Sequence, residues 1–351
     1  MQSIRLQNFR SYADDSFEFD GGVNIIVGPN ASGKTNLLEA ILVACRGSSY
    51  RARDIELVRF EQLWARLDAQ TVDQQRAVKL ESLGGSASPK KTLVVDGSSY
   101  LRPSLSKLLP VVLFEPEHLL LLSGGPERRR VFLDDLLEQT TPGFSTLRRQ
   151  YKRVLTQRNA LLKQATQSRQ QLFAWNIRLS ELGGQVVAAR YGLLERLNSS
   201  LSTVYGNIAR QKHAAALRYA GTCPTDQYGS HMLRALEAAE TLDYQRGFTA
   251  HGPHRDDVVL WLDGRRAQEA ASRGELRTML LAIKILELEV VAEARCQAPI
   301  LLLDDVFSEL DGKRRRALTE FLRPYQTFIT TTDADVVIQH FMNDCHIIPM
   351  S

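Results

Sequence analysis

The chain has 351 residues, of which 44% are hydrophobic and 24% charged, and it carries a formal net charge of +4. This composition is typical of a globular protein long enough for one large unit or two lobes, and it excludes a disordered chain. The four cysteines lack metal-ligand spacing, the N-terminus lacks the apolar core of a signal peptide, and no uncharged run approaches transmembrane length. We therefore expect a soluble cytoplasmic protein with no membrane partner.

The first third of the chain alternates short strands with turns. Ile4 and Leu6 indicate an edge strand, and the apolar run Val23–Val27 indicates a buried one. That run leads directly into a glycine loop and then into a helical stretch from residue 36. Residues 63–101 have the turn-separated alternation of a small antiparallel β section.

The middle of the chain changes to helical periodicity. Between about residues 126 and 240, apolar residues recur in steps of three and four, which predicts a helical arm. Strand signals return at residues 258–262, a helix follows from about 273 to 294, and an apolar strand occupies residues 300–303. Thr327–Thr331 is predicted to be the last strand of the sheet.

The glycine loop carries the strongest chemical signal. Two glycines flank four residues and are followed by lysine and threonine, so backbone N–H groups can converge on phosphate oxygens without side-chain obstruction. The lysine would meet the β- and γ-phosphates, the threonine hydroxyl would bind Mg²⁺, and the helix start would add partial positive charge. A glycine turn that only joins strand to helix is the alternative. We expect nucleotide contacts at Gly28, Pro29, Asn30, Ala31, Ser32, Gly33, Lys34, Thr35 and Asn36.

A pair of carboxylates follows the apolar strand at residues 300–303. Asp304 is the candidate Mg²⁺ ligand together with Thr35. Asp305 could orient or deprotonate the water that attacks the γ-phosphate, so Asp304, Asp305 and Lys34 are the candidate catalytic residues. The alternative is that the two aspartates cap the next helix.

The glycine loop and these carboxylates are separated by more than half of the chain, which implies an inserted arm. Just before the second half of the site, residues 272–277 open an amphipathic helix. The Ser272 hydroxyl and the Gly274 N–H at its start would form an anion site, although an ordinary helix cap explains them equally well.

These motifs, in this order, resemble the ATPase head shared by ABC proteins and the chromosome-maintenance family. Further stretches are similar to the RecF family of bacterial recombination-repair proteins, and the matching motifs extend from residue 3 to residue 333. The resemblance is carried by residues 8–10 (NFR), 28–35, 114–119 (FEPEHL), 124–134 (GGPERRRVFLD), 252–257 (GPHRDD), 272–275 (SRGE), 302–305 (LLDD), 308–311 (SELD) and 329–333 (ITTTD).

The resemblance implies an ATP-dependent homodimer in which Ser272 and Gly274 of one subunit face the γ-phosphate on the glycine loop of the other. It places Arg10 near the nucleotide. It also implies binding to double-stranded and single-stranded DNA at gaps or junctions, mediator partners of the RecO and RecR type, and promotion of recombinase loading.

Three departures from the family patterns affect these expectations. ABC transporters carry glutamate where this chain has Asp305 and a switch histidine where it has residues 331–333, which predicts slow ATP hydrolysis. Arg273 and Glu275 stand where the RecF pattern has glutamines, and the negative charge of Glu275 near a phosphate calls the strength of ATP-driven dimerisation into question.

The arm is the candidate DNA-binding surface. From Gln139 to Ser180 the sequence contains no carboxylate, whereas arginine and lysine recur. DNA phosphates would neutralise such a surface with salt-dependent, non-sequence-specific affinity. A solvated surface or a contact with an acidic partner is the alternative. The candidates are Arg148, Arg149, Lys152, Arg153, Arg158 and Lys163.

One further segment contains residue types that bind metals. His251, His254, Asp256 and Asp257 lie close together in the sequence, but Gly252 and Pro253 make a turn the simpler interpretation. The resemblance treats this segment as a family hallmark, so a role near nucleotide or DNA stays open.

We therefore predict an α/β protein with a P-loop ABC-type ATPase head assembled from both chain ends and an inserted helical arm lobe. Residues 1–114 and 246–351 would form the head and residues 115–245 the arm. The predicted function is a weak DNA-dependent ATPase of recombinational repair and replication restart, whose slow hydrolysis releases the dimer. Two rivals are a transporter ATPase subunit, which the basic arm and the missing histidine disfavour, and a binding protein that uses ATP only as a ligand.

Overall fold

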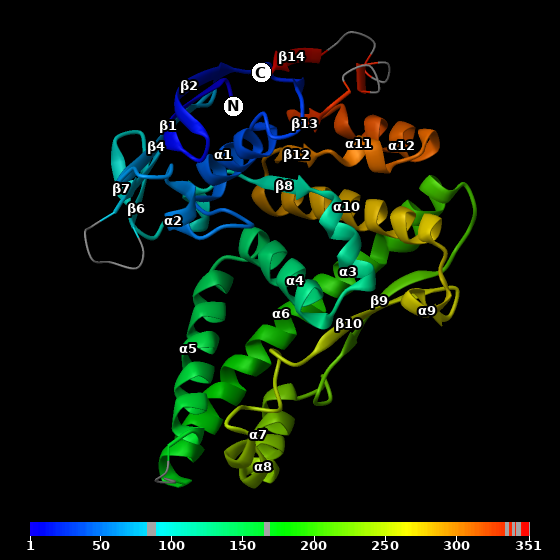
Figure 1. Cartoon of the computed structure of the whole chain (residues 1–351). Helices are drawn as coiled ribbons and strands as arrows, with labels where there is room; N and C mark the ends of the chain where they lie inside the picture. The colour runs from blue at the N-terminus through cyan, green and yellow to red at the C-terminus, as the bar shows by residue number, and fades with distance from the viewer. Residues whose placement is uncertain (83–88, 165–168, 334–336, 339–340, 342–344, 351) are drawn as a thin grey trace. The chain divides into compact units, whose positions relative to one another are not determined.

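The computed structural model describes residues 1–82, 89–164, 169–333, 337–338, 341 and 345–350 (Figure 1). The chain divides into two compact units: unit 1 comprises Met1–Pro116 with Val291–Ser351, and unit 2 comprises Glu117–Val290. Unit 1 is thus built from both ends of the chain. Residues 246–290, which the sequence analysis placed with the head, lie in unit 2 because their strand pairs with a strand of the arm region.

Unit 1 contains a parallel sheet of five strands in the order β14-β3-β13-β12-β8. Its apolar strands are buried on both faces, as expected of a parallel sheet covered on each side: Ile26 and Leu302 belong to the core that contains helix α1, and the alternating Ile25 and Leu301 are buried as well. The strands are β3 (Val23–Val27), β8 (Val111–Phe114), β12 (Ile300–Asp304), β13 (Thr327–Thr331) and β14 (Cys345–Pro349).

A second sheet of unit 1 is antiparallel and has the order β2-β1-β4-β5-β6-β7. Asp96 and Gly97, between β6 and β7, both have positive φ, as the two central residues of a type I′ hairpin turn require. The strands are β1 (Ser3–Phe9), β2 (Tyr12–Glu18), β4 (Trp64–Gln70), β5 (Gln75–Glu81), β6 (Lys90–Val95) and β7 (Ser98–Tyr100).

Helix α1 (Lys34–Arg46) lies in a core shared by both sheets of unit 1. Residues 37–45 of α1 are buried on every side of the helix, because a helix between two sheets has no solvent-facing stripe. Other helices of this unit are α2 (Asp54–Leu57), the 3₁₀ turn η1 (Leu105–Lys107), α11 (Val306–Glu309) and α12 (Gly312–Leu322).

Unit 2 is mainly helical and is organised around α6 (Arg169–Ala209), a helix of 41 residues that packs against α5, α7 and β9 (Figure 1). A three-stranded antiparallel sheet of order β11-β10-β9 completes it. Its other helices are α3 (Leu120–Ser123), α4 (Pro126–Thr140), α5 (Phe144–Leu162), α7 (Tyr228–Ala238), α8 (Glu240–Arg246) and α9 (Ala267–Ala270), and its strands are β9 (Ala215–Ala220), β10 (Asp257–Leu262) and β11 (Arg265–Arg266). The turn η2 (Pro116–Leu119) and the helix α10 (Arg273–Arg295) extend across the unit boundaries.

Three strand predictions need correction. β1 is not an edge strand, since it pairs with β2 on one side and β4 on the other. β13 is not the last strand of the sheet, because β14 pairs in parallel with β3. β9 interrupts the stretch predicted as wholly helical; it is short, and only its pairing with the distant β10 fixes it as a strand.

Candidate functional site

The glycine loop emerges from the carboxyl end of β3 and runs directly into α1. Gly33 precedes α1 with φ of 96°, a left-handed conformation that favours glycine. Gly28 is needed for a different reason: a Cβ there would lie 2.5 Å from the Met350 carbonyl oxygen and 2.9 Å from the Ser32 hydroxyl. Both glycines of the motif are therefore required by local geometry.

Lys34 folds back over the loop that precedes it. Its Nζ donates to the carbonyl oxygens of Gly28, at 2.8 Å, and of Pro29, at 2.7 Å, and the residue is buried. Because both of these acceptors are neutral, the ammonium charge at the loop stays available to an anion. This arrangement can bind phosphate.

Asp304 lies at the same edge of the parallel sheet as the glycine loop, because carboxyl ends of parallel strands share one edge. The Thr35 hydroxyl donates to Asp304 Oδ1 at 3.1 Å, across 269 positions of sequence, and the Thr330 hydroxyl donates to the same oxygen at 2.6 Å. A hydroxyl and a carboxylate oxygen in contact are hard oxygen ligands of the kind that Mg²⁺ takes. The residues present thus fit a magnesium site.

Asp305 has a strained backbone, with φ of 51°. Its N–H donates to Thr330 Oγ1 at 3.0 Å, and its side chain makes no capping hydrogen bond to α11. The helix-capping alternative for this residue is therefore not observed. Asp311 instead caps the following helix, since its carboxylate accepts from the backbone N–H of Arg314 at 3.0 Å.

A buried carboxylate that the sequence analysis missed organises one side of the loop helix. Glu39 is fully buried and accepts from Arg10 Nε and Nη2, at 2.9 and 3.0 Å, from Arg51 Nη2 at 3.0 Å and from the Ser49 hydroxyl at 2.5 Å. Burial raises the pKa of Glu39, but these donors outweigh it, so the pKa is lowered overall. Its signal in the sequence is a single carboxylate within an otherwise apolar stretch of α1.

The turn between β1 and β2 holds the same side of the loop helix. The Ser11 hydroxyl accepts from Asn36 Nδ2 at 3.0 Å, and the Tyr12 hydroxyl donates to the Gly33 carbonyl oxygen at 3.0 Å. With the contact from Arg10 to Glu39, residues 10–12 contact positions 39, 36 and 33, which are three apart and lie along one face of α1 and its N-cap. The predicted residues Arg10 and Asn36 thus lie in one hydrogen-bonded cluster next to the loop.

Ser272 and Glu275 form a reciprocal capping box at the start of α10 in unit 2. The Ser272 N–H donates to Glu275 Oε2 at 2.7 Å, and the Glu275 N–H donates to the Ser272 hydroxyl at 3.2 Å. Hydrogen bonding of the Glu275 carboxylate to the Ser272 backbone N–H, the largest contribution, and to the Ser272 side chain lowers the pKa of Glu275. The Glu275 carboxylate therefore accepts a hydrogen bond from a backbone N–H at the start of α10.

Among the predicted DNA contacts, Arg158 is wrong. Its side chain is fully buried and pairs with the equally buried Asp243 at 2.8 Å, with further hydrogen bonds to Asn176 and Thr249. The sequence gives no sign of this burial, because only the fold brings Asp243 to Arg158. Arg148 already forms ion pairs inside unit 2 with three carboxylates, those of Asp134, Asp135 and Glu138. Four candidates are exposed, namely Arg149, Lys152, Arg153 and Lys163.

The segment around residues 251–257 is an internal hydrogen-bond centre. Asp256 accepts from the hydroxyls of Tyr219 and Tyr228, each at 2.7 Å, and Asp257 pairs with Arg129 at 2.8 Å. Within the described ranges, no group of three or more His, Cys, Asp or Glu side chains could hold a metal ion. The turn interpretation of this segment agrees with the structure.

Comparison with known proteins identifies the family. A family model described as the RecF/RecN/SMC N terminal domain matches residues 1–347. Over 344 residues the chain is 37% identical to the DNA replication and repair protein RecF of Heliobacterium modesticaldum, covering 95% of this chain and 92% of that protein. The chain belongs to the RecF family. The RecF protein of Bacillus subtilis is 33% identical over 348 residues, covering 95% of this chain and 94% of that protein.

Solved structures extend the RecF relationship to the fold. A structure described as the recombination mediator protein RecF-ATPrS in the RecFOR pathway has a TM-score of 0.85 and 29% identity, covering 95% of this chain and 92% of that one. An Smc head bound to part of ScpA has a TM-score of 0.54 at 15% identity, which supports the fold alone. The predicted α/β ABC-type head of the SMC kind is confirmed. In the described ranges of this RecF-family chain, every helix is too short or too polar to cross a membrane.

Proposed function

We propose that this RecF-family chain binds ATP through Gly28–Thr35 and Asn36, with Arg10 beside them. The observation that carries this proposal is the contact of the Thr35 hydroxyl with Asp304 across 269 positions of sequence, next to the buried ammonium of Lys34. Thr35 and Asp304 would hold Mg²⁺, which would neutralise phosphate charge at this edge of the sheet. The RecF structures described as bound to ATP and ATPrS support the same ligand.

The proposed activity is slow hydrolysis of ATP. Asp305 follows the Mg²⁺ ligand and is the candidate for positioning the attacking water, while Lys34 would stabilise the charge on the transferring phosphoryl group. Aspartate is one methylene shorter than the glutamate of ABC transporters, so its carboxylate reaches less far. This difference supports slow turnover, which makes ATP a long-lived ligand.

ATP would hold a homodimer together, with Ser272 and Gly274 of one subunit in contact with the nucleotide bound to the other. The capping box supports a modified view of Glu275: its carboxylate is held by the backbone N–H of Ser272, so it need not repel the phosphate directly. The Ser272 hydroxyl accepts from the N–H of Glu275, and it would have to turn its proton away from the Glu275 carboxylate to donate to a phosphate oxygen.

DNA would bind to the exposed basic residues of α5, namely Arg149, Lys152, Arg153 and the adjacent Lys163. Their number and exposure support salt-dependent contacts with phosphates of duplex and single-stranded DNA. The proposed role is recombinational repair and replication restart in the cytoplasm, at gaps or junctions, with mediator partners of the RecO and RecR type. ATP hydrolysis would release the dimer after recombinase loading.

The central test replaces the loop lysine. Lys34→Met should abolish ATP-dependent dimerisation and the ATP-dependent part of DNA affinity, measured by sedimentation and by titration with gapped duplex, plain duplex and single strand at stated salt. Ser272→Arg is the matched variant: each monomer should still bind ATP, but dimers should not form. Unchanged ATP-dependent dimerisation in either variant would show that the sandwich is wrong.

A second candidate is a binding protein that uses ATP without turnover, which the short Asp305 side chain also favours. Phosphate release measured with and without DNA separates the two functions. The proposed ATPase requires basal release that DNA stimulates and that Asp305→Asn reduces at least tenfold. A pure binding protein shows neither.

A further inference from the structure

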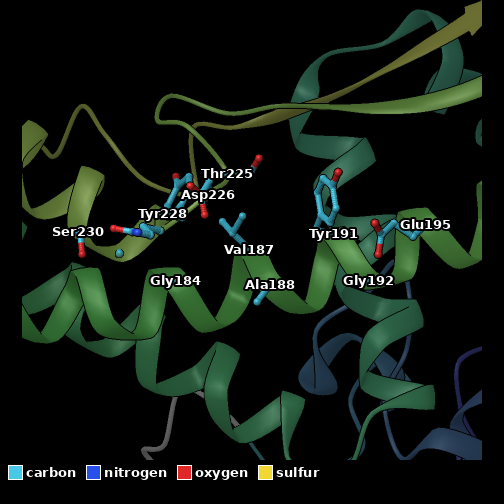
Figure 2. A pocket seen from close by; sticks show the side chains of 12 residues that line it. Gly184, Val187, Ala188, Tyr191, Gly192, Glu195, Thr225, Asp226, Tyr228 and Ser230 are labelled. Carbon is cyan, nitrogen blue, oxygen red and sulfur yellow. The ribbon is translucent and has the colours of Figure 1, made fainter.

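An open groove of about 810 Å³ lies within unit 2, and its lining includes none of the residues proposed to contact ATP or DNA. One wall is a single face of α6, and the other is the segment of residues 225–230 that leads into α7. Figure 2 shows Val187 and Tyr191 pointing from α6 to the side on which Thr225 and Asp226 lie. The α6 wall consists of Gly184, Val187, Ala188, Tyr191, Gly192 and Glu195.

Gly192 is not explained by packing within unit 2. Glycine inside a helix is destabilising relative to alanine, so a helical glycine calls for a close neighbour. Gly183 and Gly184 have such neighbours: an added Cβ would lie 2.6 Å from the Met232 sulfur and 3.4 Å from the Gly229 backbone, respectively. A Cβ on Gly192 would meet no heavy atom within 4 Å. The space above Gly192 is therefore free for an element from outside the unit.

The groove presents an apolar floor with acidic ends. Tyr191 is a large aromatic side chain with 44% of its surface exposed, next to the open Gly192. Glu195 and Asp226 are exposed carboxylates, and the described residues that line the groove include no lysine or arginine. Nucleic acid would be repelled by this lining, whereas a basic segment of a protein would be attracted.

The spacing of the two carboxylates specifies the partner further. Figure 2 shows Asp226 on the side of α6 to which Val187 points, and Glu195 lies eight residues beyond Val187 in the same lining, a rise of about 12 Å along the helix. Two residues seven positions apart on a second helix are about 10.5 Å apart on one face. Small residues at Ala188 and Gly192 allow two helix axes to approach to about 8 Å.

We propose that this groove is a docking site for a helix of a partner protein that carries two arginine or lysine side chains seven positions apart. The basic side chains pair with Asp226 and Glu195, small residues between them pack on Ala188 and Gly192, and Tyr191 covers the apolar side of the incoming helix. This interaction is independent of the proposed ATP and DNA sites.

The test uses the full chain and two fluorescein-labelled, alanine-based helical peptides of 18 residues, one with arginine at positions 6 and 13 and one with glutamate there. Fluorescence anisotropy should show at least tenfold tighter binding of the arginine peptide. Gly192→Leu and Asp226→Lys should each weaken that binding at least tenfold. Ala174→Leu, at an exposed position elsewhere on α6, is the matched control and should have no effect.

Gly192→Ala provides a second measurement that does not depend on affinity. The midpoint of thermal unfolding should rise, because alanine favours the helix and meets no neighbour, while peptide binding falls. ATP affinity should be unchanged in all groove variants, which separates this inference from the proposed function. The inference is overturned if the arginine peptide fails to bind, if both peptides bind equally, or if Gly192→Leu binds normally. A DNA oligonucleotide that displaces the peptide, or self-association that Gly192→Leu abolishes, would identify a different occupant and would also overturn it.

Discussion

Replacing Arg158 tests whether a basic residue of the arm serves DNA or the fold. Its guanidinium and the Asp243 carboxylate are both fully buried, so Arg158→Ala leaves an uncompensated charge in the core of unit 2. Breaking a buried ion pair in this way costs about 3–5 kcal/mol of unfolding free energy. At about 1.4 kcal/mol per factor of ten, the folded-to-unfolded ratio of unit 2 should fall by more than a hundredfold.

The assay is urea unfolding followed by circular dichroism, with Arg153→Ala as the matched control. Arg153 lies in the same helix but is exposed, so its removal should change stability by less than about 0.5 kcal/mol and should instead weaken DNA binding. The double variant Arg158→Met with Asp243→Leu should be less destabilised than the sum of the single changes, since no charge is left unpaired. If Arg158→Ala lost less than about 1 kcal/mol while DNA affinity fell, the assignment of Arg158 to the core would be refuted.

Further predictions concern the loop, its buried carboxylate and the partly buried His254. Gly28→Ala should lower ATP affinity at least tenfold in a binding titration, because its Cβ would collide with the Met350 carbonyl, whereas Gly21→Ala, with open space around it, should not. Glu39→Gln should reduce the unfolding free energy by about 1–3 kcal/mol in a denaturant titration, since two arginines lose their shared negative charge; an unchanged value would argue against the buried network. Burial lowers the pKa of His254 to about 4, so the unfolded chain binds more protons than the folded one between about pH 6.5 and 4, and stability should fall as the pH falls through this window. His254→Gln should flatten that part of the stability curve by up to about 3 kcal/mol, and an unaltered curve would show that the imidazole is not buried neutral.

Burial keeps the His254 ring neutral, and its two hydrogen-bond partners assign the tautomer. Nε2 lies 3.1 Å from the carbonyl oxygen of Thr249, which can only accept, so Nε2 carries the proton. Nδ1 then accepts from the Tyr151 hydroxyl at 2.7 Å. A protonated ring would have to break the hydrogen bond with Tyr151 or reverse its direction, which is a second reason for the acid sensitivity.

The sequence by itself determined the local chemistry of this protein. The glycine loop, the apolar strands and the aspartates after β12 are each specified over a few residues, because turn geometry, burial and helix starts act over short distances. Their order, through its resemblance to the heads of ABC and chromosome-maintenance proteins, predicted an ABC-type head, and the carboxylate-free arm predicted a basic surface.

Only the tertiary structure decided which residues meet across long distances. β14 pairs with β3 at one side of the parallel sheet, and Glu39 accepts hydrogen bonds from Arg10 and Arg51. Asp243 pairs with Arg158 in the core, so Arg158 is not part of the basic surface. No short stretch of the sequence predicts any of these contacts. A charge run in a sequence reports composition, whereas solvent exposure depends on what the fold brings beside each side chain. The groove on α6 could not be predicted from the sequence for the same reason. Only the structure shows that no heavy atom lies within 4 Å of a Cβ placed on Gly192.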